Sequence, residues 1–232
     1  MLVLVSPTSV EEAKEAEAGG ADIIDVKNPS EGSLGANFPW IIREISSAVS
    51  KPVSAAIGDF DFRPGTASLA AYSASLWADY VKVGLLFEKG VAEFSRAFVK
   101  AVKENGKKAV LAAYADYYRV GSISPMELPE IAAVCDADVV MVDTAVKDGK
   151  GLFDHMDFQS VVEFVDSVHD HGMLCALAGS IKLEDLQRVR DAGADIVGVR
   201  GAVCENGRGG RLKRELVERF VSAARGVRVD QD

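Results

Sequence analysis

Charged residues recur at fixed offsets from a short repeat in this chain. The repeat occupies 20–26 (GADIIDV), 77–83 (WADYVKV), 136–142 (DADVVMV) and 193–199 (GADIVGV). Four residues after its alanine stand Asp25, Lys82, Met141 and Gly198, and two residues further on stand Lys27, Gly84, Asp143 and Arg200. Residues two apart in a strand point to one face of the sheet. The repeat therefore predicts three cations and two carboxylates on one face, and unpaired buried charges are too costly to be incidental there.

Lysines gathered in this way suggest imine chemistry. Burial among other cations lowers the pKa of a lysine, so a neutral amine is available near pH 7 and can attack a carbonyl. The resulting protonated Schiff base acidifies the adjacent carbon and permits aldol or elimination steps. A second lysine or a carboxylate must then move protons. Asp25, one step below Lys27 on the same face, is expected to hold that lysine or carry its protons.

Three loops at the same predicted end add candidates. The loop 143–150 (DTAVKDGK) carries Lys147. Two positions for its side chain remain equally open: it reaches back over the mouth, or it is a solvated loop lysine. The loops 178–180 (AGS) and 200–202 (RGA) place small residues where bare backbone amides can meet an anion at a following helix. The phosphate-binding candidates are Gly179, Ser180, Arg200 and Gly201. Together, the lysines and these loops predict a metal-free carbon–carbon lyase or synthase acting on a phosphorylated carbonyl compound.

Other polar residues are assigned lesser roles. Asp59 and Asp116 end two strands in related contexts (AAIGDF and AAYADY) and are expected to cap helices rather than to orient a lysine. His155, His169 and His171 are expected on the outside of a helix, and no HExxH spacing occurs, so neither a metal centre nor a cofactor is predicted. The glycine-rich loop 205–211 (ENGRGGR) is interpreted as a flexible turn rather than a phosphate contact.

The elements that must position these residues alternate regularly. Four further apolar runs, at 2–5, 53–58, 109–115 and 174–178, lie between the repeats and bring the number of predicted strands to eight. Helical patterns fill the intervals. The first predicted helix begins at Thr8 or Ser9 and has Glu11 and Glu12 in its first turn. The others lie at about 36–49, 64–77, 90–104, 125–134, 157–171, 182–191 and 210–224. Apolar strands alternating with helices predict a parallel sheet closed into a single-domain (β/α)8 TIM barrel at 1–224, followed by a short tail at 225–232.

Composition bounds the class of protein. The 232 residues are 48% hydrophobic, as in a globular domain, and the formal net charge of −9 argues against nucleic acid as a partner. The three cysteines are far apart and predict reduced thiols. The N-terminal apolar run is too short for a signal peptide or a membrane span, so a cytoplasmic protein without membrane contact is expected. Helix residues such as Phe94, Phe98 and Phe158 would permit a homo-oligomer.

Long segments of the chain resemble one known family. They include 5–40 (VSPTSVEEAKEAEAGGADIIDVKNPSEGSLGANFPW), ADYVKVGL, AAYADYYRVG, VDTAVKDGKGLFD, CALAGSIK and DIVGVRGAVC. These are similar to the (5-formylfuran-3-yl)methyl phosphate synthase family of methanofuran biosynthesis, also called 4-(hydroxymethyl)-2-furancarboxaldehyde-phosphate synthase. The resemblance implies a lyase that condenses two glyceraldehyde 3-phosphate molecules with loss of phosphate and water. It also implies Lys27 as the Schiff-base lysine, Lys82 as a proton acceptor, and Asp25, Asp143 and Lys147 as polar residues of the site.

Two alternatives remain open. The same lysines would serve a class I aldolase or an isomerase acting on a small sugar phosphate. A non-catalytic barrel that binds a phosphorylated metabolite would use them only to neutralise charge.

Overall fold

The computed structural model describes residues 1–227. Within them, eight parallel strands close in sequence order into one barrel, because β1 pairs with both β2 and β8. The strands are β1 (Leu2–Val5), β2 (Ile23–Val26), β3 (Val53–Phe60), β4 (Tyr80–Leu85), β5 (Lys108–Tyr114), β6 (Val139–Asp143), β7 (Leu174–Leu177) and β8 (Ile196–Val199). The predicted single-domain (β/α)8 barrel is confirmed.

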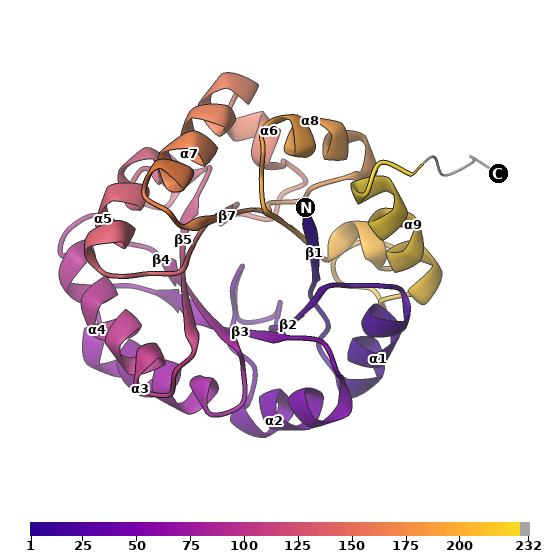
Figure 1. Cartoon of the computed structure of the whole chain (residues 1–232), viewed down its shortest axis with the longest axis horizontal. Coiled ribbons are helices and arrows are strands. Elements are labelled where there is room, and N and C mark those ends of the chain that lie inside the picture. Colours follow the sequence, from indigo (N-terminus) through magenta and orange to yellow (C-terminus); the bar gives the residue numbers. More distant parts are fainter. Residues whose placement is uncertain (228–232) are drawn as a thin grey trace.

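Helices surround the strands as an outer ring, in which α9 lies next to α1 (Figure 1). They are α1 (Val10–Ala18), α2 (Pro39–Ala48), α3 (Pro64–Ser75), α4 (Val91–Lys103), α5 (Leu128–Val134), α6 (Leu152–His155), α7 (Phe158–Asp170), α8 (Leu186–Asp191) and α9 (Arg214–Ala224). Short 3-10 helices occur at Tyr117–Arg119, Pro125–Glu127, Leu183–Asp185 and Gly201–Val203. In the described part of the chain, no helix has the length and apolarity needed to cross a membrane.

Two apolar layers hold the fold together. One fills the inside of the barrel, and its buried members are Leu4, Ile23, Leu34, Ala56, Val110, Ala112, Val139, Met141, Ala176, Ala178 and Ile196. The larger layer lies between strands and helices and contains the outward residues of every strand. This alternation confirms that Asp25, Lys82, Met141 and Gly198 face inward, since Met141 and the flanking Ile23 and Ile196 belong to the inner layer.

The repeat itself has a structural cause at its aspartate. Asp22, Asp79, Asp138 and Asp195 each accept a hydrogen bond from the first or second residue of a neighbouring odd-numbered strand, at Val3, Val53, Ala109 and Cys175 respectively. The N···O distances are 2.9, 3.0, 2.7 and 2.8 Å. Each aspartate thus satisfies the free amide at the start of one strand while its own segment enters the next. The repeat fixes the register of four strand pairs.

The start of α1 follows the predicted capping pattern. The Ser9 hydroxyl accepts a hydrogen bond from the amide of Glu12, and Glu11 and Glu12 stand in the first turn. At the other end of the chain, α9 ends at Ala224, and Arg225 pairs with Asp22 at 3.0 Å. The predicted tail at 225–232 begins there, and its residues 228–232 lie outside the described residues.

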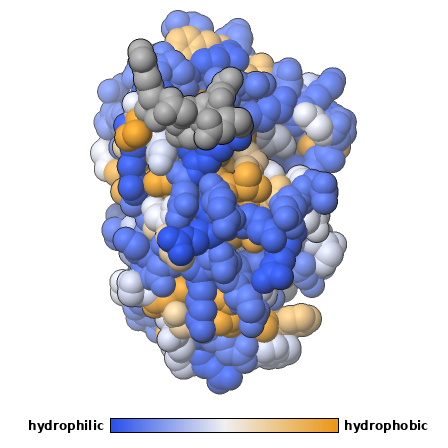
Figure 2. All heavy atoms as spheres, turned by 90° about the vertical axis from the view of Figure 1, so that its right-hand side faces the viewer, coloured by the Kyte–Doolittle hydropathy of each residue, from blue (hydrophilic) through white to orange (hydrophobic). Residues whose placement is uncertain are grey.

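The prediction that Phe94 and Phe98 lie on helix faces available for an oligomer contact is wrong. Phe94 and Phe98 are fully buried between α4 and the barrel, because the hydrophobic face of that helix supplies the core; only Phe158 is partly exposed. Exposed large apolar side chains instead include Trp40 on α2 and Leu69 on α3. The side of the molecule that carries α9 is mainly hydrophilic, with hydrophobic residues in small separate areas (Figure 2).

Gly84 gives a test of packing at the strand ends. The Tyr114 hydroxyl donates to Asp59 directly over Gly84, and Asp59 also accepts from the Leu34 amide at 3.2 Å. A Cβ at position 84 would overlap the Tyr114 hydroxyl and the Asp59 carboxylate. Because both groups are held by other contacts, we expect Gly84→Ala to lower the free energy of unfolding by about 1–3 kcal/mol in urea denaturation.

Gly65→Ala is the matched control. Nothing lies within 4 Å of a Cβ at that position in α3, and alanine favours a helix, so this change should be neutral or stabilising by up to about 1 kcal/mol. Equal effects of the two substitutions would contradict the packing described for Gly84.

Candidate active site

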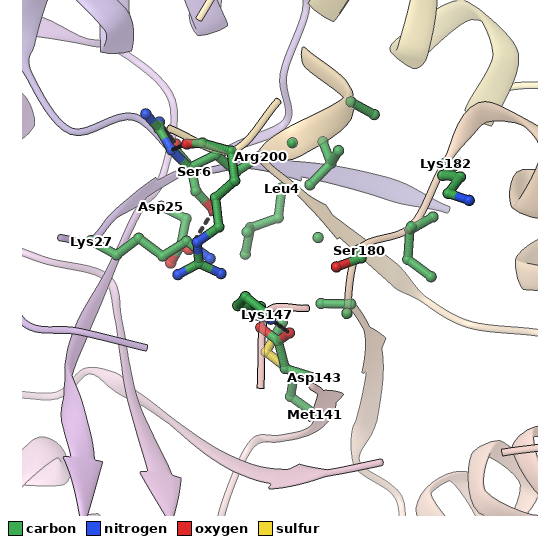
Figure 3. Close-up of a pocket in the computed structure, with 18 of the residues that line it drawn as sticks. Leu4, Ser6, Asp25, Lys27, Met141, Asp143, Lys147, Ser180, Lys182 and Arg200 are labelled. Atoms are coloured by element: carbon green, nitrogen blue, oxygen red, sulfur yellow. Dashed lines mark hydrogen bonds and ion pairs between the residues drawn. The ribbon is translucent and has the colours of Figure 1, made fainter. Parts of the chain in front are cut away.

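The strands' carboxyl ends open into a cavity of about 380 Å³. All nine residues predicted from the sequence line it, namely Asp25, Lys27, Lys82, Asp143, Lys147, Gly179, Ser180, Arg200 and Gly201. Figure 3 shows Asp25 and Lys27 on one side of the cavity, Asp143 and Lys147 on a second, and Ser180 on a third. Residues far apart in the sequence therefore meet at one mouth, where active sites of these barrels lie.

An ion pair is buried at the base of the cavity. The Lys82 ammonium donates to both carboxylate oxygens of Asp25 at 2.9 Å, and neither side chain is more than 1% exposed. The hydroxyls of Ser6 and Ser54 complete the set of donors to Asp25, at 2.9 and 2.8 Å. Burial by itself would raise the pKa of Asp25, but the charges of Lys82 and Lys27 and these hydrogen bonds lower it overall. Asp25 is thus held as a carboxylate.

Lys27 follows β2 on the same face and is also buried. Among the contacts of residues 1–227, its amine has no hydrogen bond to protein and no ion pair within 4 Å. Burial lowers the pKa of Lys27 from 10.5 to about 7; Asp143 and Asp25 oppose this shift, and the positive charges of Lys82 and Lys147 add to it. Near neutral pH a substantial fraction of this amine is uncharged, which is the form that attacks carbonyl carbon.

A second ion pair lies opposite, at the end of β6. The Lys147 ammonium contacts Asp143 at 2.6 Å and the Thr144 hydroxyl at 3.0 Å. Burial would raise the pKa of Asp143, but the charges of Lys147 and Lys27 lower it well below its usual range. Lys147 therefore reaches back over the mouth, and the alternative of a solvated loop lysine is wrong.

The aspartates at the ends of β3 and β5 have different roles from those expected. The Asp116 carboxylate accepts from the amides of Ala145 and Val146 at 2.6 and 2.9 Å, and no side-chain cap is formed at the helix that follows it. Asp59 binds Tyr114 and the Leu34 amide within β3. The capping prediction for both residues is wrong, because groups from other strands and loops, and not the amides of a following helix, donate to these carboxylates. Asp116 instead fixes the loop that carries Lys147.

The loop after β7 contributes Gly179, Ser180 and Ile181 to the lining of the cavity. Gly179 has φ +99° and Ser180 has φ +52°, a conformation that a residue with a Cβ adopts only under constraint. Within the described residues, the amides of Gly179, Ser180 and Ile181 donate to no protein acceptor. Successive free amides in such a turn form a concave anion site.

Several functional residues escaped prediction. Ser6 and Ser54 bind Asp25 from neighbouring strands, and Glu12 pairs with Arg200 at 3.0 Å across 188 residues. The glycine-rich loop, interpreted as a flexible turn, brings Arg208 to the cavity. The sequence signals for these residues are weak, because serines in strands and glutamates in first helical turns are common for other reasons.

The three histidines are not among the residues that line the cavity. His169 and His171 are exposed near the end of α7, as expected, whereas His155 lies in α6 with its Nδ1 3.1 Å from the Tyr118 hydroxyl. In the part of the chain that the structure covers, no three His, Cys, Asp or Glu residues come together as metal ligands. The groups that line the cavity include amines, carboxylates and guanidinium groups.

The geometry defines a single-domain (β/α)8 barrel with a buried lysine that has no ion pair within residues 1–227, beside two lysine–carboxylate pairs. The sequence profile described as 4-HFC-P synthase matches residues 3–221, and the chain belongs to this family. A (5-formylfuran-3-yl)methyl phosphate synthase of Methanococcus maripaludis is 52% identical over 235 residues, covering 97% of this chain and 100% of that protein. The synthase of the same name from Methanocaldococcus jannaschii is 54% identical over 228 residues, covering 94% and 97%. The protein is therefore an enzyme, a synthase, as the resemblance implied.

Solved structures of other enzymes share the fold. Phosphoribosyl anthranilate isomerase from Thermus thermophilus is 18% identical with a TM-score of 0.66, covering 98% of this chain and 100% of that one. A 3-hexulose-6-phosphate synthase is 20% identical with a TM-score of 0.67, covering 96% and 99%. At such identities the likeness concerns the barrel and not the reaction.

The amine of Lys27 should titrate near neutral pH. We expect its rate of acetylation by acetic anhydride, followed by peptide mass spectrometry, to rise with a midpoint at about pH 7. Asp143→Asn should lower this midpoint, because the Asp143 charge raises the pKa of Lys27. Asp166→Asn, at an exposed position of α7, serves as the control and should leave it unchanged. A wild-type midpoint above about pH 9 would contradict the assignment.

Proposed function

We propose that this enzyme condenses two molecules of glyceraldehyde 3-phosphate into (5-formylfuran-3-yl)methyl phosphate, with loss of phosphate and water, in methanofuran biosynthesis. The observation that carries the proposal is the buried amine of Lys27, which has a pKa of about 7 and no partner among the described residues. The names of the relatives supply the product. The reaction makes the enzyme a carbon–oxygen lyase that works through a lysine Schiff base.

Lys27 starts the reaction and Lys82 moves the first proton. The neutral Lys27 amine attacks one triose carbonyl, and loss of water gives an imine whose positive charge acidifies the adjacent carbon. Lys82 is the base that accepts that carbon's proton, and the Asp25 carboxylate, which accepts two hydrogen bonds of 2.9 Å from its amine, stabilises the positive charge that Lys82 then carries. The enamine then attacks the aldehyde of the second triose, which forms the new carbon–carbon bond.

Asp143 and Lys147 serve the later steps. Their 2.6 Å contact lies across the cavity from Asp25 (Figure 3), so protons can be transferred on both sides of the bound carbon skeleton. We assign to them the proton transfers of phosphate elimination, ring closure and dehydration. A substrate-bound state with groups on two sides is consistent with a cavity of about 380 Å³, within the range of small-molecule sites.

We assign the phosphate groups of the substrate to the loops after β7 and β8. The amides of Gly179 and Ser180, which donate to no acceptor in residues 1–227, and the loop at Gly201 suit an anion, and the charge of Arg200 adds to the positive potential. We place the enzyme in the cytoplasm, where buried free thiols such as those of Cys135, Cys175 and Cys204 stay reduced.

A product assay tests the function directly. With glyceraldehyde 3-phosphate as sole substrate, the synthase should release inorganic phosphate and a conjugated aldehyde that absorbs in the ultraviolet. An aldolase or isomerase on the same barrel would form no furan, and a binding barrel would change nothing. Absence of the absorbing product, with substrate consumed or not, would contradict the proposal.

Lys82→Arg separates proton transfer from ion pairing. Arginine keeps the positive charge beside Asp25 but does not lose a proton at accessible pH. We expect kcat to fall about 10²–10⁴-fold, the usual share of a general base, while the thermal unfolding temperature changes little. Lys100→Arg, at an exposed position of α4, should leave kcat unchanged. Retained turnover in Lys82→Arg would remove Lys82 from the proton-transfer role.

A further inference from the structure

Most cations of the mouth already have carboxylate partners. Lys82, Lys147 and Arg200 lie 2.9, 2.6 and 3.0 Å from Asp25, Asp143 and Glu12 respectively. Lys182, at the exposed edge, has Glu184 at 3.8 Å. Of the cavity-lining cations in residues 1–227, this leaves Lys27 and Arg208 without a carboxylate within 4 Å. One is the nucleophile of the proposed reaction, and the other is a guanidinium to which the proposed reaction gives no role.

The donors of Arg200 are largely engaged by the protein. Its Nη1 donates to the Ser6 carbonyl at 2.7 Å and to Glu12 at 3.0 Å. Its Nε donates to the Arg208 carbonyl at 2.9 Å, and its Nη2 to the Gly210 carbonyl at 3.2 Å. Glu12 also accepts from the Leu212 amide at 3.0 Å. Arg200 and Glu12 therefore hold the loop 205–212 in place from below.

The side chain of Arg208 is oriented but not saturated. Its Nη2 donates to the carbonyls of Gly32 and Ser33 at 2.9 and 3.3 Å. Its Nε and Nη1 donate to no acceptor among the described residues, although the side chain is half-buried. Burial lowers the pKa of Arg208, with nearby Arg200 adding to the effect and Asp143 opposing it. The environment thus costs this cation free energy that an anionic ligand would recover.

The loop of Arg208 lies against the short helix Gly201–Val203. A Cβ on Gly201 would lie 3.7 Å from the Arg208 backbone nitrogen, so the loop passes directly over the start of the short helix after β8. The Nε and Nη1 groups of Arg208, which donate to no acceptor in residues 1–227, can give charge-assisted hydrogen bonds to a phosphate group, and Gly179, Ser180 and Gly201 line the same cavity.

We propose that Arg208 binds a phosphate group of the substrate directly, and that Arg200 is a positioning residue that acts by holding the loop of Arg208. The inference rests on the proposed function only in taking the substrate to be phosphorylated. It extends that function by naming the side chain that recognises the phosphate, and it changes the role of Arg200 from contact to support.

Binding of inorganic phosphate, measured by calorimetry without turnover, tests the role of Arg208. Arg208→Gln should raise the dissociation constant for phosphate about 10- to 100-fold, as expected for loss of a charge-assisted contact. Arg211→Gln, at an exposed position of the same loop, removes the same charge and should change it less than about threefold. An equal effect of the two substitutions, or no phosphate binding by the wild type, would overturn the proposal.

A double-mutant cycle tests the role of Arg200. Arg200→Lys keeps the charge but loses the fork that holds two loop carbonyls, so it should weaken phosphate binding in the wild-type background. In the Arg208→Gln background it should weaken phosphate binding no further, because the contact it supports is already absent. Additive losses would show that Arg200 contacts phosphate itself and would overturn its positioning role.

These outcomes are separate from the fate of the proposed function. If the enzyme forms the furan phosphate but Arg208→Gln binds phosphate like the wild type, the inference fails while the function stands. If no furan forms but Arg208→Gln loses phosphate binding, the inference stands while the proposed function fails.

Discussion

A lysine and an aspartate that are both almost inaccessible to water form an ion pair inside the barrel. Removing two such charges from solvent is costly, and the pair persists because Asp25 accepts from Lys82 at both oxygens and from Ser6 and Ser54 as well. Because both oxygens of Asp25 already accept from these groups, Asp25 forms no ion pair within 4 Å with Lys27, which lies on the same face. That constraint, together with burial, keeps the amine of Lys27 partly neutral and gives the mouth its chemistry.

The fold is predictable because the repeat encodes it at several levels. The repeat's aspartates, such as Asp22 and Asp79, tie the start of a neighbouring strand, and its alanines are buried where strand and helix meet. The two-residue period of strands then determines which side chains point inward. From that period alone the sequence predicts Asp25, Lys82, Asp143 and Arg200 at one mouth, and all four line the same cavity.

The contacts made by the loops could not be predicted in the same way. Glu12 and Arg200 are 188 residues apart, and the position of Arg208 depends on carbonyls of Gly32 and Ser33. No periodic pattern specifies such contacts. Asp116 is an example: its position at a strand end predicted a helix cap, but its carboxylate accepts from amides of the loop that follows β6. Predictions based on periodicity succeed where the backbone is regular and fail where partners distant in sequence compete.

We propose that Lys27, and no other lysine of the mouth, forms a covalent imine with the substrate. Borohydride reduction in the presence of glyceraldehyde 3-phosphate, followed by peptide mass spectrometry, measures this directly. We expect a single stable adduct on Lys27, because Lys82 and Lys147 are held as ion pairs by Asp25 and Asp143. An adduct on Lys82 or Lys147, or turnover without any trapped adduct, would contradict the role of Lys27 as the imine-forming residue.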